Sequence, residues 1–235
     1  MNNIRNFKKF FSGKTRHKRV DNINDANKFI FVHIPKNAGT SVYRALGMEE
    51  SVHYTIHEYQ QILGSSYSKY FTFCFVRNPF GRFVSLYNYA RMEESYYHNS
   101  INPEKAKFGK HQDYDLLKNA SLDEAVDYLV EGKLKSWDGG KQWLPQYKWI
   151  LNTNNKISVD YIGRTENIFF DFRNLSKMLK MDIHPPLNHL NKSTDAQISY
   201  KKIISPQARK KLEEYYKKDF ELFGYSFDFD NKYFI

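Results

Sequence analysis

The sequence predicts a single α/β domain in which a parallel β-sheet is flanked by helices. Three short apolar runs, at residues 28–34, 71–76 and 161–163, have the length and the β-branched and aromatic content of buried strands. Between and after them, apolar residues recur at spacings of three and four, which is the helical period. Strands that alternate with helices favour a parallel sheet covered on both faces. A chain of 235 residues is long enough to give such a domain a sizeable core.

The first predicted strand leads into the segment His33–Ser41, which reads His-Ile-Pro-Lys-Asn-Ala-Gly-Thr-Ser. A helix is expected to begin near Thr40, and the amides of its first turn have no partners within the helix. Those amides and the positive end of the helix dipole attract anions. Gly39 lets the backbone approach an oxyanion, and Lys36 supplies a full charge. The sequence therefore predicts an anion site at this loop.

The residue order of this loop differs from that of a Walker A loop. In a Walker A loop the lysine follows the second glycine, and a hydroxyl after the lysine holds Mg²⁺. Here Lys36 precedes Gly39, and no hydroxyl directly follows the lysine. The loop is thus suited to a phosphate or phosphosulfate without the usual metal ligand. No spacing of His, Cys and Asp indicates a zinc site, so no metal is expected.

The second predicted strand, Phe71–Val76, ends at Arg77. Ligands of parallel sheets bind beyond the carboxyl ends of the strands, so Arg77 is expected to face the same crevice as Lys36. A helix is expected from Gly81, and it carries Ser85. Arg77 and Ser85 together predict a clamp for a second phosphate.

Capping and stop signals delimit further helices downstream. The capping box Ser121–Glu124 opens one helix, which Gly132 ends. Another helix is expected from about Glu166, directly after the third strand. A last helix is predicted from Ser205-Pro206, an N-cap followed by proline, to Gly224.

The balance of charge indicates an anionic partner. A net charge of +10 and a pI near 9.4 suit nucleotides, acidic glycans, nucleic acid or an anionic membrane. Residues 1–27 are expected to form a mobile basic tail ahead of a folded domain over residues 28–235. The tail lacks an apolar signal region, and no segment approaches the ~18 apolar residues that span a bilayer. We expect a cytoplasmic protein, with contact between the tail and a membrane surface left open.

Together the two motifs resemble the PAPS-dependent sulfotransferases, in particular their carbohydrate 2-O-sulfotransferase-like branch. The segments Pro35–Ser41 and Val76–Ser85 carry the likeness, with Asn78 where many members have Asp. Weaker likenesses at residues 161–167 and 189–193 extend it over roughly residues 28 to 225. The resemblance implies the P-loop-like sulfotransferase fold, PAPS as sulfuryl donor, PAP as product and a carbohydrate hydroxyl as acceptor. The Lys- and Asn-rich composition favours a bacterial source.

The resemblance also implies roles for individual residues. The cradle of the phosphosulfate would consist of Lys36, Asn37, Ala38, Gly39, Thr40 and Ser41. Arg77 and Ser85 would hold the 3′-phosphate, and Lys192 and Ser193 are weaker candidates for contacts with the donor. Lys36 is further expected to stabilise charge on the bridging oxygen as PAP leaves.

A general base should take the proton of the acceptor hydroxyl, and histidine suits this task near neutral pH. His53 and His57 lie between the two motifs, in the interval where the resembling family has its catalytic histidine. The stretch Val52–Tyr54 is the best local match, so His53 is the first candidate. His57 and the adjacent Glu58 are the alternatives, whereas His33 is expected to be structural.

Contacts with the acceptor are the least defined by the sequence. Residues 92–118 are polar and Tyr-rich without periodicity, and we interpret them as a long loop near the site, where His111 is a candidate contact. The segment Lys135–Trp143 combines aromatics, glycine and lysines, which suits sugar binding and core packing equally. Pro145-Gln146 resembles a Pro-Gln step of related sequences, which favours a place at the cleft.

Two other functions stay open at this point. The first is a P-loop-like ATP-dependent kinase in which Val159-Asp160 imitates a Walker B acid, although the Walker A order is missing. The second is a non-enzymatic basic module that binds nucleic acid. Such a module would explain the charge but not the ordered loop and Arg77, and no recognised nucleic-acid motif is present, so nucleic acid is not the expected partner.

Overall fold

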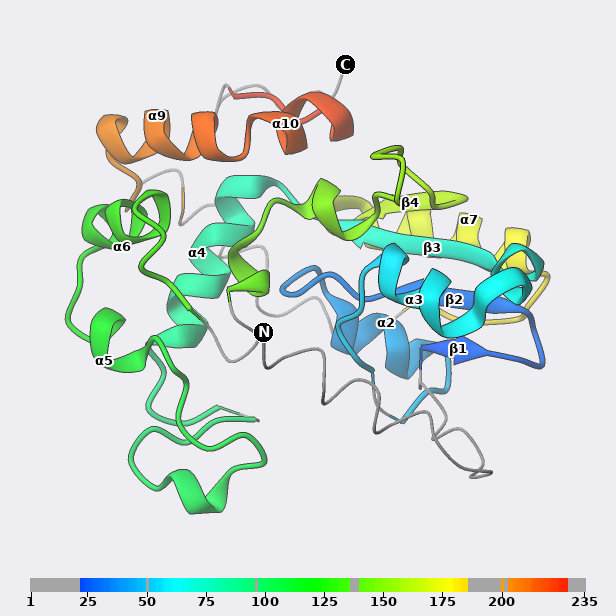
Figure 1. The fold of residues 1–235 in the computed structure, drawn as a ribbon, viewed down its shortest axis with the longest axis horizontal. Helices are drawn as coiled ribbons and strands as arrows, with labels where there is room; N and C mark the ends of the chain where they lie inside the picture. Colours follow the sequence, from blue (N-terminus) through cyan, green and yellow to red (C-terminus); the bar gives the residue numbers. More distant parts are fainter. Residues whose placement is uncertain are drawn as a thin grey trace.

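The computed structural model describes residues 22–49, 51–95, 97–135, 140–185, 200 and 203–227. Its sheet has the strand order β1–β2–β3–β4 (Figure 1). The strands are β1 Ile23–Asn24, β2 Phe29–Val32, β3 Phe71–Val76 and β4 Tyr161–Arg164. β1 is antiparallel to β2, whereas β2, β3 and β4 run parallel. The expected fold class, an α/β domain with a mostly parallel sheet flanked by helices, is confirmed.

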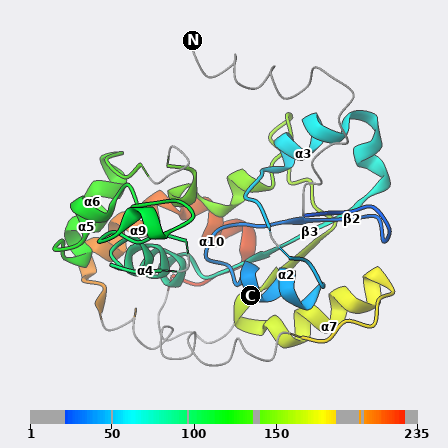
Figure 2. The same ribbon diagram turned by 90° about the horizontal axis from the view of Figure 1, so that it is seen from below.

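The two faces of the sheet bury different residues because successive side chains of a strand point to opposite sides. One face packs against α2 (Gly39–Ala45) and α7 (Ile168–Leu179) through Phe29, Phe31, Phe73 and Phe75. The other face contributes Ile30, Val32, Cys74 and Val76 to a larger core. Figure 2 shows α2 and α7 on one side of the sheet and α3 on the other.

The larger core is covered by α3 (Ile56–Leu63), α4 (Pro79–Ala90), α5 (Tyr114–Leu117), α6 (Leu122–Val130), α9 (Pro206–Tyr215) and α10 (Lys217–Phe223). Short 3₁₀ turns are η1 Gly64–Lys69, η2 Pro103–Lys105, η3 Lys141–Trp143, η4 Gln146–Trp149 and η5 Thr165–Asn167. None of the helices described is long and apolar enough to cross a bilayer.

Several sequence predictions are confirmed in detail. β3 has the predicted bounds. The capping box of α6 forms, because Glu124 N donates to Ser121 Oγ at 3.2 Å and Ser121 N donates to Glu124 Oε2 at 2.8 Å. Ser205 caps α9 in the same way, accepting from Ala208 N at 3.1 Å.

Three helices differ from the predictions. The single last helix expected up to Gly224 is two helices, α9 and α10, which meet at Tyr216, where the buried hydroxyl donates to Trp143 O at 2.9 Å. α4 begins at Pro79 rather than at Gly81, because Asn78 Oδ1 accepts from Phe80 N at 3.0 Å and caps it. α3 was not predicted.

The fold begins earlier than the predicted boundary between residues 27 and 28. The side chain of Asn22 is buried, and its Nδ2 donates to Phe31 O at 2.8 Å and to Val52 O at 2.9 Å. β1 then pairs with β2, so residues 22–27 belong to the sheet and its turn. The remainder of the expected basic tail lies outside the described residues. A two-residue strand is too short to show a period of two, so the sequence had no signal for it.

Between α4 and α5 the chain forms an arm, residues 91–113, which projects from the molecule at the lower left of Figure 1. Its described part contains η2 and an isolated bridge between Glu94 and Asn99. The arm corresponds to the long loop expected over residues 92–118, except that α5 occupies the end of that range.

Candidate functional site

The loop between β2 and α2 has an unusual backbone. Lys36 and Ala38 have positive φ angles of 67° and 58°, a conformation that non-glycine residues rarely adopt. Such strain is concentrated at functional sites. Ala38 is the N-cap of α2, and no side chain caps that helix, so the first-turn amides are not satisfied by a local side chain. This backbone is compatible with an oxyanion ligand, and the anion site stays a prediction.

Asn37 ties this loop to the neighbouring strand. Its Nδ2 donates to Phe75 O at 2.8 Å and to Gln146 Oε1 at 2.7 Å. Gln146 in turn accepts from Arg77 N at 2.9 Å and donates to Arg77 O at 2.8 Å. The buried Asp219 on α10 accepts from Gln146 N at 2.7 Å. The side chain of Asn37 is therefore a brace, and its expected contact with the donor is left to its main chain.

Gly39 is required because of a neighbouring side chain. A Cβ at this position would lie 1.7 Å from His33 Nε2, which is a severe overlap. The sequence predicted this glycine only from the approach of an anion. In the structure the imidazole of His33 fills the space beside Gly39.

Lys36 provides a cation at this loop with a perturbed pKa. Burial, together with the nearby guanidinium of Arg77, lowers the pKa of Lys36 to about 8. The Lys36 Nζ lies 4.3 Å from the ring centroid of Tyr89. Of the two hydroxyl residues that follow, Thr40 is exposed and Ser41 is partly buried.

Arg77 follows β3 directly and approaches the same loop. Its Nη1 donates to Lys36 O at 3.3 Å. Burial lowers the pKa of the Arg77 guanidinium, although the carboxylate of Glu166 acts in the opposite direction. A Cβ on Gly81 would lie 3.4 Å from Arg77 Nε, so the guanidinium rests against the first turn of α4. Ser85 is one turn further on the same side of α4 and is partly buried. The predicted pairing of Arg77 with Lys36 and Ser85 thus has a geometric basis.

Arg82 is a structural arginine. It is almost completely buried and donates to three carbonyl oxygens: Pro35 O at 3.1 Å, Leu144 O at 2.9 Å and Gln142 O at 2.6 Å. These bonds hold the start of the anion loop against the segment that carries Gln146.

His53 lies beside the loop, in contact with His33. Its Nδ1 is 2.9 Å from His33 O, and the two ring centroids are 4.2 Å apart. Because a carbonyl can only accept, Nδ1 carries the proton and the lone pair of His53 is on Nε2. His33 Nδ1 bonds with Ser51 Oγ, and burial, His53 and Lys36 keep the pKa of His33 well below its ordinary value. A neutral histidine therefore supports a second histidine that can accept a proton.

A family model described as the sulfotransferase family matches residues 22–226, which is most of the chain and includes the loop, Arg77 and His53. The chain belongs to the sulfotransferase family. No curated protein and no solved structure matches it. The sulfotransferase is thus a transferase that acts on sulfuryl groups, with its two motifs at the carboxyl ends of β2 and β3.

The other base candidates of the sulfotransferase have different surroundings. His57 is exposed on α3, where its Nε2 is 2.8 Å from Gln61 Nε2. Glu58 caps α3 by accepting from Thr55 N at 2.8 Å, and it pairs with Lys141 Nζ at 2.6 Å. These bonds lower the pKa of Glu58 despite its partial burial. Glu58 is therefore a weaker base candidate than His53.

The remaining expected site residues cannot be placed or have packing roles. Lys192 and Ser193 lie outside the described residues. Of the segment expected to suit sugar binding, Trp143 is buried in the core and donates from Nε1 to Asp113 Oδ2 at 3.0 Å. Pro145-Gln146, by contrast, reaches the site through Gln146. Among the described residues no cluster of His, Cys, Asp and Glu could hold a metal ion, and the absence of a metal stays a prediction.

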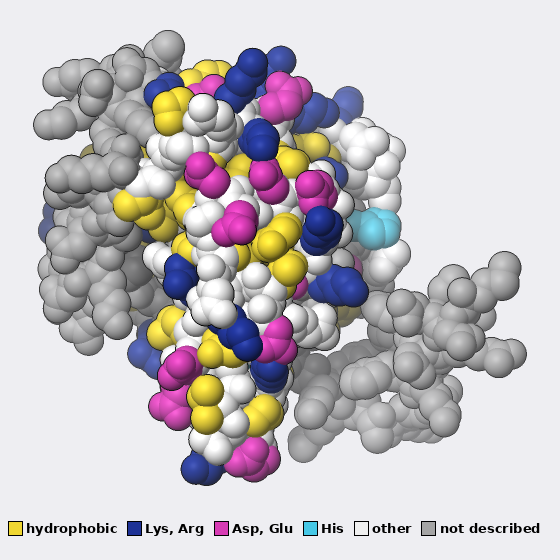
Figure 3. Space-filling view, turned by 90° about the vertical axis from the view of Figure 1, so that its left-hand side faces the viewer, with side chains coloured by type: hydrophobic (Ala, Val, Ile, Leu, Met, Phe, Trp, Pro, Cys, Tyr) yellow, Lys and Arg dark blue, Asp and Glu magenta, His cyan; other side chains and the backbone are white. Residues whose placement is uncertain are grey.

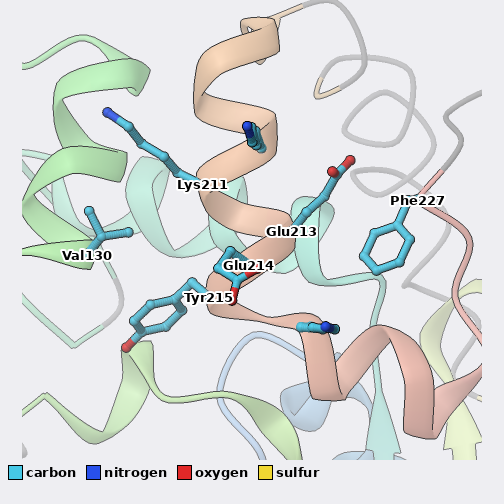
Figure 4. Close-up of a pocket in the computed structure, with 8 residues that line it drawn as sticks. Val130, Lys211, Glu213, Glu214, Tyr215 and Phe227 are labelled. Atoms are coloured by element: carbon cyan, nitrogen blue, oxygen red, sulfur yellow. The ribbon is translucent and has the colours of Figure 1, made fainter.

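Figure 4 shows a cavity of about 630 Å³ beside α9, lined by residues such as Val130, Lys211, Tyr215 and Phe227. None of its lining residues belongs to the anion loop, Arg77 or His53. The chemistry of the two motifs, rather than the size of a cavity, therefore locates the site.

Three site residues were missed by sequence reasoning. Tyr89 had a usable signal, because it follows Gly81 and Ser85 at intervals of four on one side of α4. Asp219 had none, since an acidic residue in a Lys-rich helix normally faces solvent. Ser51 had none either, because its contact with His33 spans 18 positions of the chain.

Proposed function

We propose that this sulfotransferase transfers the sulfuryl group of PAPS to a hydroxyl of a carbohydrate, with His53 as general base. The family supports sulfuryl transfer, and the identity of donor, acceptor and base is our proposal. On composition alone, the proposal is completed by a bacterial, cytoplasmic enzyme, with contact between its basic N-terminus and a membrane surface left open.

The observation that carries the proposal is the arrangement of two cations along one side of α4. Arg77 rests against Gly81, and Lys36 lies over Tyr89, two turns further along. Ser85 lies between them on the helix. Two separate anionic groups of one nucleotide, a 5′-phosphosulfate at Lys36 and a 3′-phosphate at Arg77 and Ser85, match this spacing of charges.

The reaction requires an in-line path and stabilisation of charge. The acceptor oxygen forms a bond to sulfur while the bond between sulfur and the bridging oxygen breaks. The hydroxyl proton goes to His53 Nε2, and the electron pair stays on the bridging oxygen of PAP. Lys36 stabilises that oxygen with its ammonium, and the loop amides stabilise the sulfuryl oxygens.

The carbohydrate acceptor is supported by the resemblance to the 2-O-sulfotransferase-like branch and by the positive net charge, which suits an acidic glycan. The arm contributes to this side of the site, since Tyr89 contacts Lys36 and packs edge-on against His111.

A kinase is disfavoured by the position of Asp160. This carboxylate accepts from Thr72 N at 2.7 Å and from Thr72 Oγ1 at 2.9 Å, near the amino end of β3. A Walker B acid would have to lie at the opposite, carboxyl end, where Lys36 and Arg77 are found.

A nucleic-acid module is disfavoured because no recognised nucleic-acid motif is present, and the one face that Figure 3 shows adds no basic stripe. On that face, basic, acidic and hydrophobic side chains are interspersed. Binding to a phosphate backbone instead favours a continuous basic stripe.

The donor is tested by thermal melting of the full chain with PAP or with ATP and Mg²⁺. PAP is expected to raise the melting temperature without metal, because a ligand that binds only the folded state stabilises it. ATP with Mg²⁺ is expected to do so poorly, and the reverse result would refute the donor assignment. Incubation with ³⁵S-labelled PAPS and a panel of glycans, small glycosides and tyrosine peptides then identifies the acceptor.

A further inference from the structure

The ammonium of Lys36 lies over the face of the Tyr89 ring, 4.3 Å from its centroid. A lysine head sits on a flexible stem of four carbons, so its position must be held by its surroundings. An aromatic face attracts a cation, and it does so more strongly where water is excluded. Lys36 is partly buried, so part of this water is removed, and burial is the first cause of its lowered pKa.

Tyr89 is itself held from several directions. It lies in the last turn of α4, and Ser95 Oγ donates to its hydroxyl at 3.3 Å. The rings of His98 and His111 meet it edge-on, each with a centroid distance of 5.8 Å. The Tyr89 ring therefore offers a fixed surface for the Lys36 ammonium.

The two histidines behind Tyr89 are buried at the base of the arm, 5.0 Å apart. Burial lowers the pKa of both, that of His111 to about 4, so both are neutral at neutral pH and add no positive charge beside Lys36. Asp113 N donates to His111 Nδ1 at 3.2 Å, which fixes that ring. His98 Nδ1 is buried and has no hydrogen-bond partner in the part of the chain described. A buried nitrogen without a hydrogen-bond partner lowers the stability of the fold. An apolar side chain at position 98 would therefore pack at a smaller cost in stability.

We propose that Tyr89 is a positioning residue of sulfuryl transfer: supported by His98 and His111, its ring holds the ammonium of Lys36 where the bridging oxygen of the donor departs. This inference rests on the proposed function, since it assigns Lys36 to the leaving group. The ring is what matters, because its face and not its hydroxyl contacts the cation. The arm thereby becomes part of the catalytic apparatus although it projects from the body.

The first test compares Tyr89→Phe, which keeps the ring, with Tyr89→Leu and Tyr89→Met, which remove it. We expect kcat to fall about 3- to 30-fold in the Leu and Met variants, with the KM for the acceptor nearly unchanged. Tyr89→Phe should stay within about twofold of wild type. Wild-type kcat in both ringless variants, or an equal loss in Tyr89→Phe, would overturn the proposal. Two ringless variants are included so that the misfolding of one, seen by thermal melting, leaves the other to decide.

The second test does not depend on turnover. In protein with ¹³C-labelled lysine, the ε-protons of Lys36, assigned through Lys36→Arg, should be shifted upfield by the ring current of Tyr89. The shift should persist in Tyr89→Phe and disappear in Tyr89→Leu. An unshifted Lys36 in an active wild-type enzyme would refute the positioning role. Shifted ε-protons in an enzyme that fails to use PAPS would instead refute the proposed function.

Discussion

In each of two pairs of neighbouring histidines one member interacts electrostatically with Lys36, His33 in the first pair and His111 in the second, and the pairs differ in what they can do. In the first pair, His53 is half-buried and bonds through Nδ1 to the carbonyl of His33, which puts its lone pair on Nε2. In the second pair, His98 and His111 are both buried, and the lone pair of His111 on Nδ1 already accepts from Asp113 N. The residue type is the same in both pairs. Burial and the nitrogen that carries the lone pair make one pair suited to catalysis and the other to support.

The largest expected effect is a loss of turnover when a histidine of either pair is substituted. His53→Ala should lower kcat by about 10²- to 10⁴-fold, the range for loss of a general base, while PAP still binds. His111→Asn, whose Oδ1 can still accept from Asp113 N, should lower kcat less than about tenfold. Steady-state kinetics and calorimetric PAP binding measure both variants. Near-normal turnover in His53→Ala would show that the first pair does not contain the base.

The next effect concerns the link between the anion loop and the first pair. Gly39→Ala should overlap the His33 ring and lower the melting temperature by about 3–10 °C, as expected for overpacking of a buried site. Adding His33→Ala should restore part of the lost stability, because it removes the overlapping ring. An unchanged melting temperature in Gly39→Ala alone would mean that the His33 ring is not fixed beside the loop.

A smaller effect is expected in the pH dependence of PAP binding. The pKa of Lys36 is lowered to about 8, so above that pH the free enzyme loses the charge that attracts the donor. Affinity for PAP should therefore fall as pH rises above about 8, by at most about tenfold per pH unit. Calorimetry at pH 7, 8 and 9 checks this, with Lys36→Met as the control, whose weaker affinity should change less. If the affinity for PAP depended equally on pH in wild type and in Lys36→Met, the charge of Lys36 would not be what attracts the donor.

The smallest effect is on acid stability and belongs to the second pair. The pKa of His111 is lowered to about 4, so the unfolded chain takes up this proton before the folded chain does. The resulting stability is complete above the ordinary histidine value of about 6.5 and is lost as pH falls toward 4. Between pH 7 and 5 the melting temperature of wild type should thus fall by a few degrees more than that of His111→Asn. A larger fall of the melting temperature in His111→Asn than in wild type would show that the pKa of His111 is not lowered in the folded protein.

Much of the fold was predictable because its signals are local. The bounds of β3 follow from a run of apolar residues ended by Asn78-Pro79, and the start of α6 follows from its capping box. α3 carries the same kind of signal, Thr55–Glu58, but it is only eight residues long and buries only Ile56 and Tyr59, so its apolar stripe is weak. The break between α9 and α10 has no such local signal. It coincides with a hydrogen bond from Tyr216 to Trp143, a residue 73 positions away in the chain.

The candidate site divides in the same way. Lys36, Arg77 and Ser85 were predictable because their motifs stand directly at strand ends or at helical spacing from them. Pro145-Gln146 was expected at the cleft, but its bracing bonds were not predictable, because Gln146 meets Asn37 across 109 positions of the chain and is held by Asp219 across 73. Arg82 is charged and yet buried, which depends on three carbonyl oxygens that only the folded chain brings together.

The sequence by itself determined an α/β sulfotransferase with an anion loop at Lys36, an arginine beyond the next strand and a histidine between them. Strand ends, glycines and caps are encoded by neighbouring residues, so they can be recognised without coordinates. Only the tertiary structure decided which nitrogen of His53 carries the proton, why Gly39 admits no side chain, and which ring lies under Lys36. Those properties depend on burial and on contacts between residues distant in the chain, and no local pattern specifies either.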